Sequence, residues 1–261
     1  MGVGVFDLYN YSLLTISLVG LAAILAAIEI GRWLGVHVSD QDDDNVSTLE
    51  GAAIGLLALM VGFTFAMSLS RFEARRDAIL AEANAIGTTA LRARLLPEPH
   101  RKEVLGLLRD YVKVRLDLTQ RPATPADLVP AIQKLNALQE RLQQAEAMTA
   151  IDRSVVPTGL FIQTLNEMID DQAKRLAAIR NRVPNVVQLA LFGVAIIASG
   201  FAGYAIGLDK RRSRFPVYVM GLLAGAVIIL ILDLDRPGAG FIEVSQQPMI
   251  DTASSIAGFD D

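Results

Sequence analysis

Residues 51–70 read GAAIGLLALMVGFTFAMSLS, a run without a single charged side chain. Residues 71–88 follow without a break and read RFEARRDAILAEANAIGT, and no proline occurs before Pro97. An apolar run of this length is enough to cross the core of a bilayer as a helix, and the lack of proline lets that helix continue. The stretch from Leu49 to about Leu96 is therefore predicted to be one long helix, half in lipid and half in water.

The composition is typical of a membrane protein. The 261-residue chain is 52% hydrophobic with a mean hydropathy of +0.39, and its apolar excess lies in four blocks. The absence of cysteine excludes disulfides, thiol catalysis and cysteine-ligated metals. No stretch is basic enough to indicate a nucleic-acid partner, and no nucleophile motif or phosphate-binding loop is present. We expect a protein of the lipid bilayer that is not an enzyme and binds no cofactor.

The four apolar blocks predict four membrane spans, at about 8–33, 50–70, 185–208 and 215–232. Tyr9, Tyr11 and Trp33 flank the first block, as interfacial aromatic residues often do. A capping-box pattern, Ser47-Thr-Leu-Glu50, predicts that the second helix starts at Ser47.

The spans divide the chain into four parts. Residues 1–70 and 185–235 are each expected to form a transmembrane hairpin. Residues 71–184 hold most of the charges and are expected to form a helical extramembrane domain, with helices at about 100–120, 126–150 and 158–182 separated by prolines. Residues 236–261 read as an acidic tail with little periodicity. The predicted fold class is all-α, with a helical bundle inserted between spans 2 and 3.

Small residues recur four or seven apart in two spans: Gly51, Gly55 and Gly62 in the second, Gly221 and Gly225 in the fourth. Such spacing lets helices approach closely, so we expect these glycines to pack helices and to support self-association. Glu29 is the acidic residue placed within a span, and Arg32 lies three residues later. An ionisable residue in a membrane is often functional, but an ion pair on one helix face is the favoured interpretation here.

The sequence leaves the orientation in the membrane open. Arg32 and the basic residues of 210–214 lie in the two short loops, which favours a helical domain outside the cytoplasm. Arg71, Arg75, Arg76 and other basic residues lie close to the membrane on the opposite side, which favours a cytoplasmic domain.

Several phrases resemble the bestrophin-like family of bacterial membrane proteins. They are VGFTFAMSLSRFEARR at 61–76, EANAIGT at 82–88, LLPEP at 95–99, LDLDRP at 232–237 and VSQQP at 244–248. The family is distantly similar to bestrophins, which are pentameric anion channels with four spans per subunit. The resemblance implies a multi-pass protein of the bacterial inner membrane that self-associates, with five copies suspected. It also implies that the second span lines a pore for inorganic ions and that the helical domain is cytosolic.

The resemblance suggests pore residues on the second span. Bestrophins narrow their pore with three apolar residues spaced four apart, and Leu57, Val61 and Phe65 match that spacing. Thr64 and Ser68 would face the same pore, and Arg71 and Arg75 at its end would attract anions. In the alternative interpretation, Thr64 and Ser68 bond to carbonyls of their own helix and the two arginines anchor the helix at the headgroups.

Two acidic groups are weak candidates for metal binding. Asp40, Asp42 and Asp44 are spaced as in a calcium-binding loop, but Asn45 replaces its glycine and Gly51 its bidentate glutamate, which favours a solvated loop. Asp233 and Asp235 follow the fourth span, where bestrophins carry a calcium clasp, and they would bind a cation or cap neighbouring helices. No metal site is predicted with these residues.

The leading hypothesis is therefore an oligomeric ion channel, for anions by the resemblance, with the second span lining the pore. The alternative is a non-conducting structural or sensory membrane protein whose helical domain binds a partner. A secondary transporter is less favoured, because the spans lack buried charges and proline-broken helices.

Overall fold

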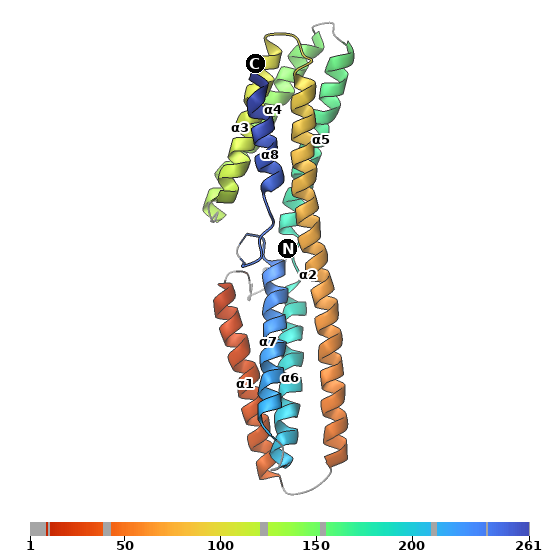
Figure 1. The fold of residues 1–261 in the computed structure, drawn as a ribbon, viewed down its shortest axis with the longest axis vertical. Coiled ribbons are helices and arrows are strands. Elements are labelled where there is room, and N and C mark those ends of the chain that lie inside the picture. Colours follow the sequence, from red (N-terminus) through yellow and green to blue (C-terminus); the bar gives the residue numbers. More distant parts are fainter. Residues whose placement is uncertain are drawn as a thin grey trace. The chain divides into compact units, whose positions relative to one another are not determined.

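The computed structural model describes residues 9, 11–38, 43–120, 125–151, 155–209, 213–238 and 240–260. These residues form α-helices with a short 3-10 turn at the end and no strand, which confirms the all-α class (Figure 1). The chain divides into two compact units, residues 1–72 with 182–242 and residues 73–181 with 243–261.

The first unit holds the membrane helices. They are α1 (Leu13–His37), the first part of α2 (Asp43–Ala93), α6 (Asn185–Leu208) and α7 (Phe215–Asp235). Each of these helices is long and apolar enough to cross a bilayer. Many of their large apolar side chains are exposed, among them Leu14, Leu18, Val186, Ile197 and Leu223. Lipid is a favourable environment for exposed apolar side chains, so the first unit is a membrane domain.

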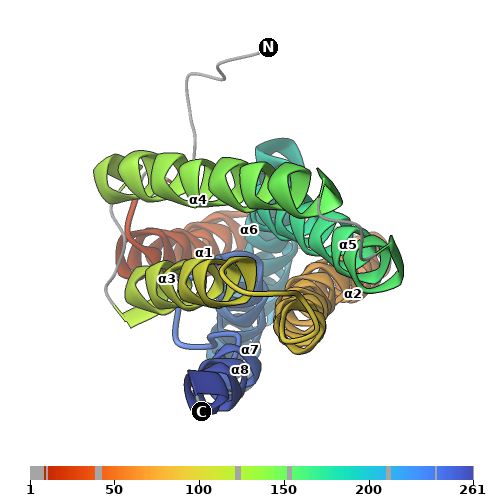
Figure 2. The same cartoon turned by 90° about the horizontal axis from the view of Figure 1, so that it is seen from above.

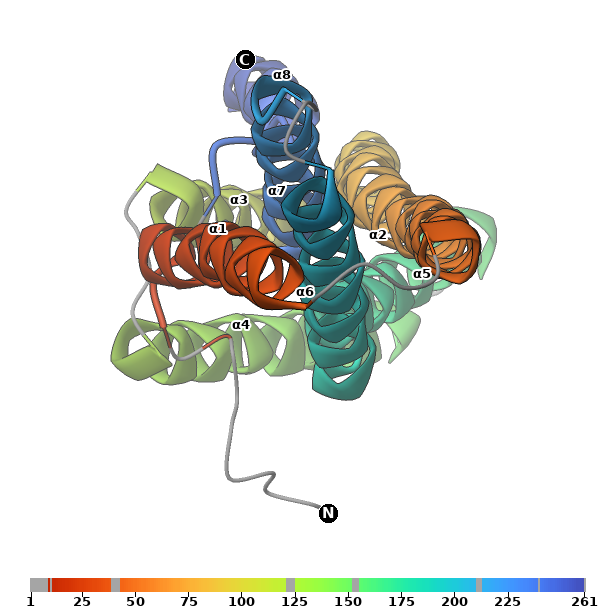
Figure 3. The same ribbon diagram turned by 90° about the horizontal axis from the view of Figure 1, so that it is seen from below.

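The backbones of α1 and α6 meet at glycines, and the two helices lie side by side when viewed from below (Figure 3). A Cβ atom added at Gly203 would overlap the carbonyl oxygen of Ile28, and one added at Gly31 would overlap that of Gly200. Close approach of this kind gains van der Waals contact where no hydrophobic driving force acts between helices. Ile24, Ile28, Leu191 and Ile228 form the centre of the core that results.

The second unit is a helical bundle. It contains α2 from Glu73, α3 (His100–Gln120), α4 (Pro125–Ile151), α5 (Val155–Arg180) and α8 (Gln247–Ala257), followed by a 3-10 turn over Gly258–Asp260. Figure 2 shows α3 running beside α4. Ile86, Leu108, Leu135, Phe161 and Leu165 are among its buried side chains. The helices at 100–120 and 185–208 have the bounds expected from the sequence.

Other elements differ from the expectations. The second helix starts at Asp43, one turn before the capping box, and ends at Ala93. The first span is shifted toward the C-terminus, to Leu13–His37. The acidic tail contains α8, which the sequence analysis missed: Met249 and Ile256 are buried in the core of the second unit. The signal was present in the sequence, because Met249, Ala253 and Ile256 are four and three residues apart and so share one face of a helix.

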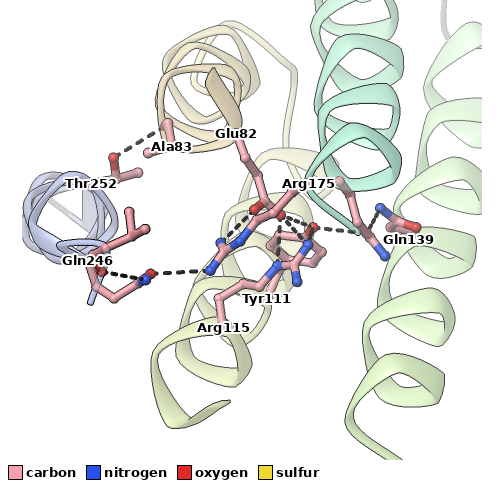
Figure 4. A network of polar contacts seen from close by, with 10 residues as sticks. Glu82, Ala83, Tyr111, Arg115, Gln139, Arg175, Gln246 and Thr252 are labelled. Carbon is pink, nitrogen blue, oxygen red and sulfur yellow. Dashed lines mark hydrogen bonds and ion pairs between the residues drawn. The ribbon is translucent and has the colours of Figure 1, made fainter. Parts of the chain in front are cut away.

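A buried polar network joins the helices of the second unit (Figure 4). Glu82 of α2 is fully buried, and its carboxylate accepts hydrogen bonds from Arg115 Nε of α3 and Arg175 Nη1 of α5, each at 2.7 Å. The hydroxyl of Tyr111 lies 2.7 Å from Glu82 Oε1. Gln246, just before α8, accepts from Arg175 Nη2 at 3.2 Å. One carboxylate therefore holds four segments of the unit together.

The electrostatics of this network follow from its burial. Burial, and then the negative charge of Glu82, raise the pKa of Tyr111, so its hydroxyl stays protonated and donates a hydrogen bond. The two guanidiniums outnumber the carboxylate, and a buried charge needs a partner and hydrogen bonds to remain in the interior. Removing Glu82 would leave both arginines without their common acceptor.

The close contact at Gly203 generates a stability prediction. Replacing Gly203 with Ala places a methyl group against the Ile28 carbonyl, so we expect a loss of about 1–3 kcal/mol in unfolding free energy. Thermal melting of the detergent-solubilised protein, followed by circular dichroism, measures this loss. Gly193→Ala in the same helix is the control, since nothing lies within 4 Å of its added Cβ, and it should leave the midpoint unchanged or raise it. Equal midpoints for the two variants would contradict the packing.

The Glu82 network generates a second prediction. Glu82→Ala leaves two buried guanidiniums without their carboxylate partner and should lower the unfolding free energy by about 3–5 kcal/mol. Glu82→Gln keeps the shape and two hydrogen-bonding groups, and should cost less. The same melting experiment measures both variants, with Glu103→Ala on the exposed side of α3 as control. A melting curve for Glu82→Ala that matches the control would show that the network does not hold the bundle.

Candidate functional site

The membrane part of α2 has a packed face. Thr64 and Ser68 are buried, and Leu57, Val61 and Phe65 are half-buried against the core of the first unit. The Thr64 hydroxyl donates to the carbonyl of Met60 at 2.7 Å, as in the alternative that has this residue bond to its own helix. Ser68 Oγ is buried without a hydrogen-bond partner among the described residues. The five residues predicted to line a pore thus lie on the side of α2 that faces its own chain.

The opposite face of α2 is open. Among the described residues, a Cβ added at Gly51, Gly55 or Gly62 would meet no atom within 4 Å apart from the backbone of its own helix. Between these glycines Leu59 is 56% exposed, and next to them Phe63 is 64% exposed. Within the part of one chain that the structure describes, the three glycines therefore have no packing partner.

The two arginines that follow the span do not project from the open face. Arg71 is half-buried, and its Nη1 donates to the carbonyl of Met67 at 3.3 Å. Arg75 is only 3% exposed. Both side chains continue the packed face, because residues three and seven positions after Ser68 lie on the same side of a helix.

A small apolar crevice of about 230 Å³ lies between α2, α6 and α7. Leu57 and Val61 line it from α2, Ala198 from α6, and Gly221 and Ala224 from α7. Its lining is almost entirely aliphatic, so it offers no chemistry for an ion.

The glycines of the fourth span and the intramembrane charged residues contact other residues of the same chain. Gly221 and Gly225 of α7 lie against side chains of α1, including Ile28 and Leu21. Arg32 Nη2 is 2.7 Å from Glu29 Oε2, and Tyr218 of α7 hydrogen-bonds to the other oxygen of the same carboxylate. The ion pair expected at Glu29 is thus present.

The two aspartates after the fourth span act as acceptors for backbone and side-chain donors. Asp233 accepts from the N–H groups of Phe241 and Ile242 at 2.7 and 3.0 Å. Asp235 accepts from the N–H of Val183 at 2.9 Å and also binds Gln188 and the Tyr9 hydroxyl. This arrangement fits the capping alternative.

No group of three or more metal-ligating side chains occurs among the described residues. Asp40 and Asp42 lie outside the described residues, and so does the side chain of Asp44.

Sequence reasoning did not single out the Glu82 network, and it named the glycines of the open face of α2 as packing residues and not as an exposed surface. A signal for the first was present: Glu82 follows Arg75 by seven residues, so the two share one side of the helix. The partners Arg115 and Arg175 come from distant helices, and only the fold brings them together.

Comparisons with known proteins agree with this architecture. The profile of the bestrophin-like domain matches residues 17–249. None of the curated proteins compared with the chain matches it. A bacterial bestrophin homologue from Klebsiella pneumoniae, solved as a variant, is 16% identical with a TM-score of 0.68, over 94% of this chain and 97% of that chain. Another structure of a Klebsiella pneumoniae homologue is 18% identical with a TM-score of 0.66, over 94% and 97%. A structure described as a membrane protein is 15% identical with a TM-score of 0.70, also over 94% and 97%.

At these identities the solved structures show a common fold, and the profile shows the family. The matched segment begins in α1 and ends in α8, so it includes the membrane helices and the bundle between them. The resemblance indicated by the sequence motifs is thereby confirmed, and the protein belongs to the bestrophin-like family.

Proposed function

We propose that the protein is an oligomeric ion channel of the bacterial inner membrane, in which α2 from several copies lines the pore. The observation that carries the proposal is the open face of α2. A membrane helix that exposes three glycines in line offers its backbone to a close neighbour, and the side chains beside them are free to face a pore. Five copies is the number that the resemblance to bestrophins implies.

Two sets of residues are candidates for the constriction of this pore. The sequence predicted Leu57, Val61 and Phe65, but their packing against the core of the first unit would have to open before they could face water. Leu59 and Phe63 are exposed and lie four residues apart, so they share the open face. The packing supports Leu59 and Phe63 as the constriction, with the predicted set as the second candidate.

The preference for anions was predicted from the resemblance to bestrophins, with Arg71 and Arg75 as the residues expected to attract anions. Their placement on the packed side of α2 gives that prediction no support: Arg75 is buried, and Arg71 is half-buried and donates to a carbonyl of its own helix. If α2 lines the pore, other side chains of the helix set the sign of the conducted ion.

The channel is tested by recording currents from the purified protein in planar bilayers. Leu59→Ala with Phe63→Ala should widen the constriction and change the unitary conductance severalfold, because the two side chains project from the open face. Leu57→Ala with Phe65→Ala is the matched control: it removes packing and should lower the melting midpoint instead. If only the control pair changed the conductance, the constriction would have to lie on the packed face of α2.

The same recordings separate the proposal from its main rival. The absence of current at every voltage and pH, together with a monomeric mass in detergent, would contradict the channel. That outcome would favour the non-conducting structural or sensory protein whose helical domain binds a partner.

Calcium should have no effect on the channel. Asp233 and Asp235 already accept hydrogen bonds from three backbone N–H groups, so a cation would have to displace these donors. Currents measured with calcium and after chelation with EGTA should superimpose. Asp235→Asn, which weakens the acceptor for the Val183 N–H, should lower the melting midpoint without introducing a calcium response. A current that falls on chelation would restore these aspartates as metal ligands.

A further inference from the structure

One aromatic side chain of the first unit is almost entirely uncovered just after the last membrane helix. Phe241 is 85% exposed, more than any other large apolar residue that the structure describes. The next two values belong to Val186 at 75% and Phe215 at 74%, and both of these residues lie in the first turn of a membrane helix. Phe241 belongs to the same unit, in the connection that follows α7.

The backbone of this connection fixes the level of Phe241 along the membrane helices. The N–H groups of Phe241 and Ile242 donate to the carboxylate of Asp233 at 2.7 and 3.0 Å, and Asp233 lies in the last turn of α7. The connection therefore folds back onto the end of the fourth span instead of leading away from it. Phe241 lies level with the point where the apolar run of α7 ends.

The same contact gives the connection one defined shape. A Cβ atom added at Gly240 would overlap Asp233 Oδ1, so only glycine lets the backbone lie against this buried carboxylate. Gly238 has a φ of +69°, in the left-handed region that favours glycine, and it allows the turn after α7. The backbone of Phe241 is thus held in place while its ring contacts almost nothing, an arrangement that presents the ring to an outside partner.

Other apolar side chains that are exposed at this level indicate which partner it is. Arg236 Nη1 donates to the carbonyl of Tyr11 at 2.8 Å, and the side chain of Tyr11 is exposed. The N–H of Val183 donates to Asp235 at 2.9 Å, which places the exposed Val186 within a turn of the same level. Three segments that are far apart in the sequence therefore expose apolar side chains at the end of α7. Lipid is the medium that surrounds exposed apolar side chains of a membrane unit.

The exposed charge at this level fits the headgroups of lipids. Arg182 is exposed, and its guanidinium lies 4.5 Å from the centre of the Tyr9 ring. Arg182 is the residue before Val183, so it too lies near the end of α7. Cations beside aromatic rings are typical of the boundary of a membrane, where phosphates lie next to the ends of the apolar spans.

We propose that Phe241 is a lipid anchor, which inserts its ring between the headgroups and the acyl chains of the leaflet at the end of α7. Transfer of the ring from water to lipid is favourable in proportion to the apolar area that it removes from water. The fixed backbone reduces the conformational entropy that insertion costs. A second copy of the chain is the other partner that could cover the ring, and the experiment distinguishes the two. The inference does not require the protein to conduct ions.

Tryptophan fluorescence of the full chain in phosphatidylcholine vesicles tests the anchor. The chain has one tryptophan, so Phe241→Trp in a Trp33→Phe background carries a single reporter. Its emission should be shifted to the blue. Lipids brominated close to the headgroup should quench it severalfold more than lipids brominated near the chain end, because the ring is expected at the boundary.

Two matched reporters in the same background calibrate the depth. Leu223→Trp, at an exposed position in the middle of α7, should be quenched most by bromine near the chain end. Ile250→Trp, at an exposed position of α8 in the second unit, should be quenched by neither lipid.

The shape of the connection gives a second measurement. Gly240→Ala places a methyl group against the Asp233 carboxylate and should displace the connection, so the quenching of the Phe241→Trp reporter should fall severalfold. Gly193→Ala, whose added Cβ meets nothing within 4 Å, is the control and should leave the quenching unchanged.

Each other outcome would overturn the anchor. Emission typical of tryptophan in water, without quenching, would show that the ring stays in solvent. Blue-shifted emission that neither lipid quenches would assign the ring to an interface between copies. Strongest quenching by bromine near the chain end would place the ring in the bilayer core and not at the boundary. These results do not depend on whether current is observed, so the anchor and the channel are tested separately.

Discussion

One face of the helix α2 packs against other helices both in the membrane and in the bundle outside it. The rest of the structure depends on this constraint. Along α2 the packed face runs from Leu57 through Thr64 and Ser68 to Arg75, Glu82 and Ile86. In the membrane part it contributes aliphatic contacts and the Thr64 hydroxyl, which bonds to its own helix. In the bundle it contributes a carboxylate that two arginines neutralise. Because the helix is unbroken, the spacing of its residues determines which of them share a face in both environments. The burial of one face therefore determines which residues the opposite face exposes.

The outlines of the fold could be read from the sequence because they depend on length, hydropathy and proline. The uncharged run at 51–70 and the bounds 100–120 and 185–208 are properties of local sequence, and the structure agrees with them. The helix α8 was missed although Met249, Ala253 and Ile256 have helical spacing in the tail. What local sequence does not show is the surface on which they pack, which α2 and α3 supply.

The sequence predicted which helix carries the candidate site, but not which face of that helix is exposed. The spacing of Leu57, Val61 and Phe65 matches that of any apolar stripe, and Leu59 and Phe63 satisfy the same rule. Glycine spacing pointed to the opposite stripe as the one for packing, yet no described part of the same chain packs on these glycines. Other helices of the chain cover one of the two stripes and leave the other exposed. This difference depends on contacts between residues that are far apart in the sequence. The likeness to solved bestrophin homologues reflects the fold that creates these contacts.

The docking of α8 has a consequence for biosynthesis. Synthesis proceeds from the N-terminus, and domains tend to fold as their segments emerge. The bundle cannot do so, because Met249 and Ile256 complete a core that begins with Ala83 and Ile86, and the whole of α6 and α7 is translated in between. The last two spans must therefore enter the bilayer while the bundle still exposes the apolar slot meant for α8. A chain whose synthesis stops before α8 would be inserted in the membrane with that apolar surface exposed, which is the kind of surface that chaperones and proteases recognise.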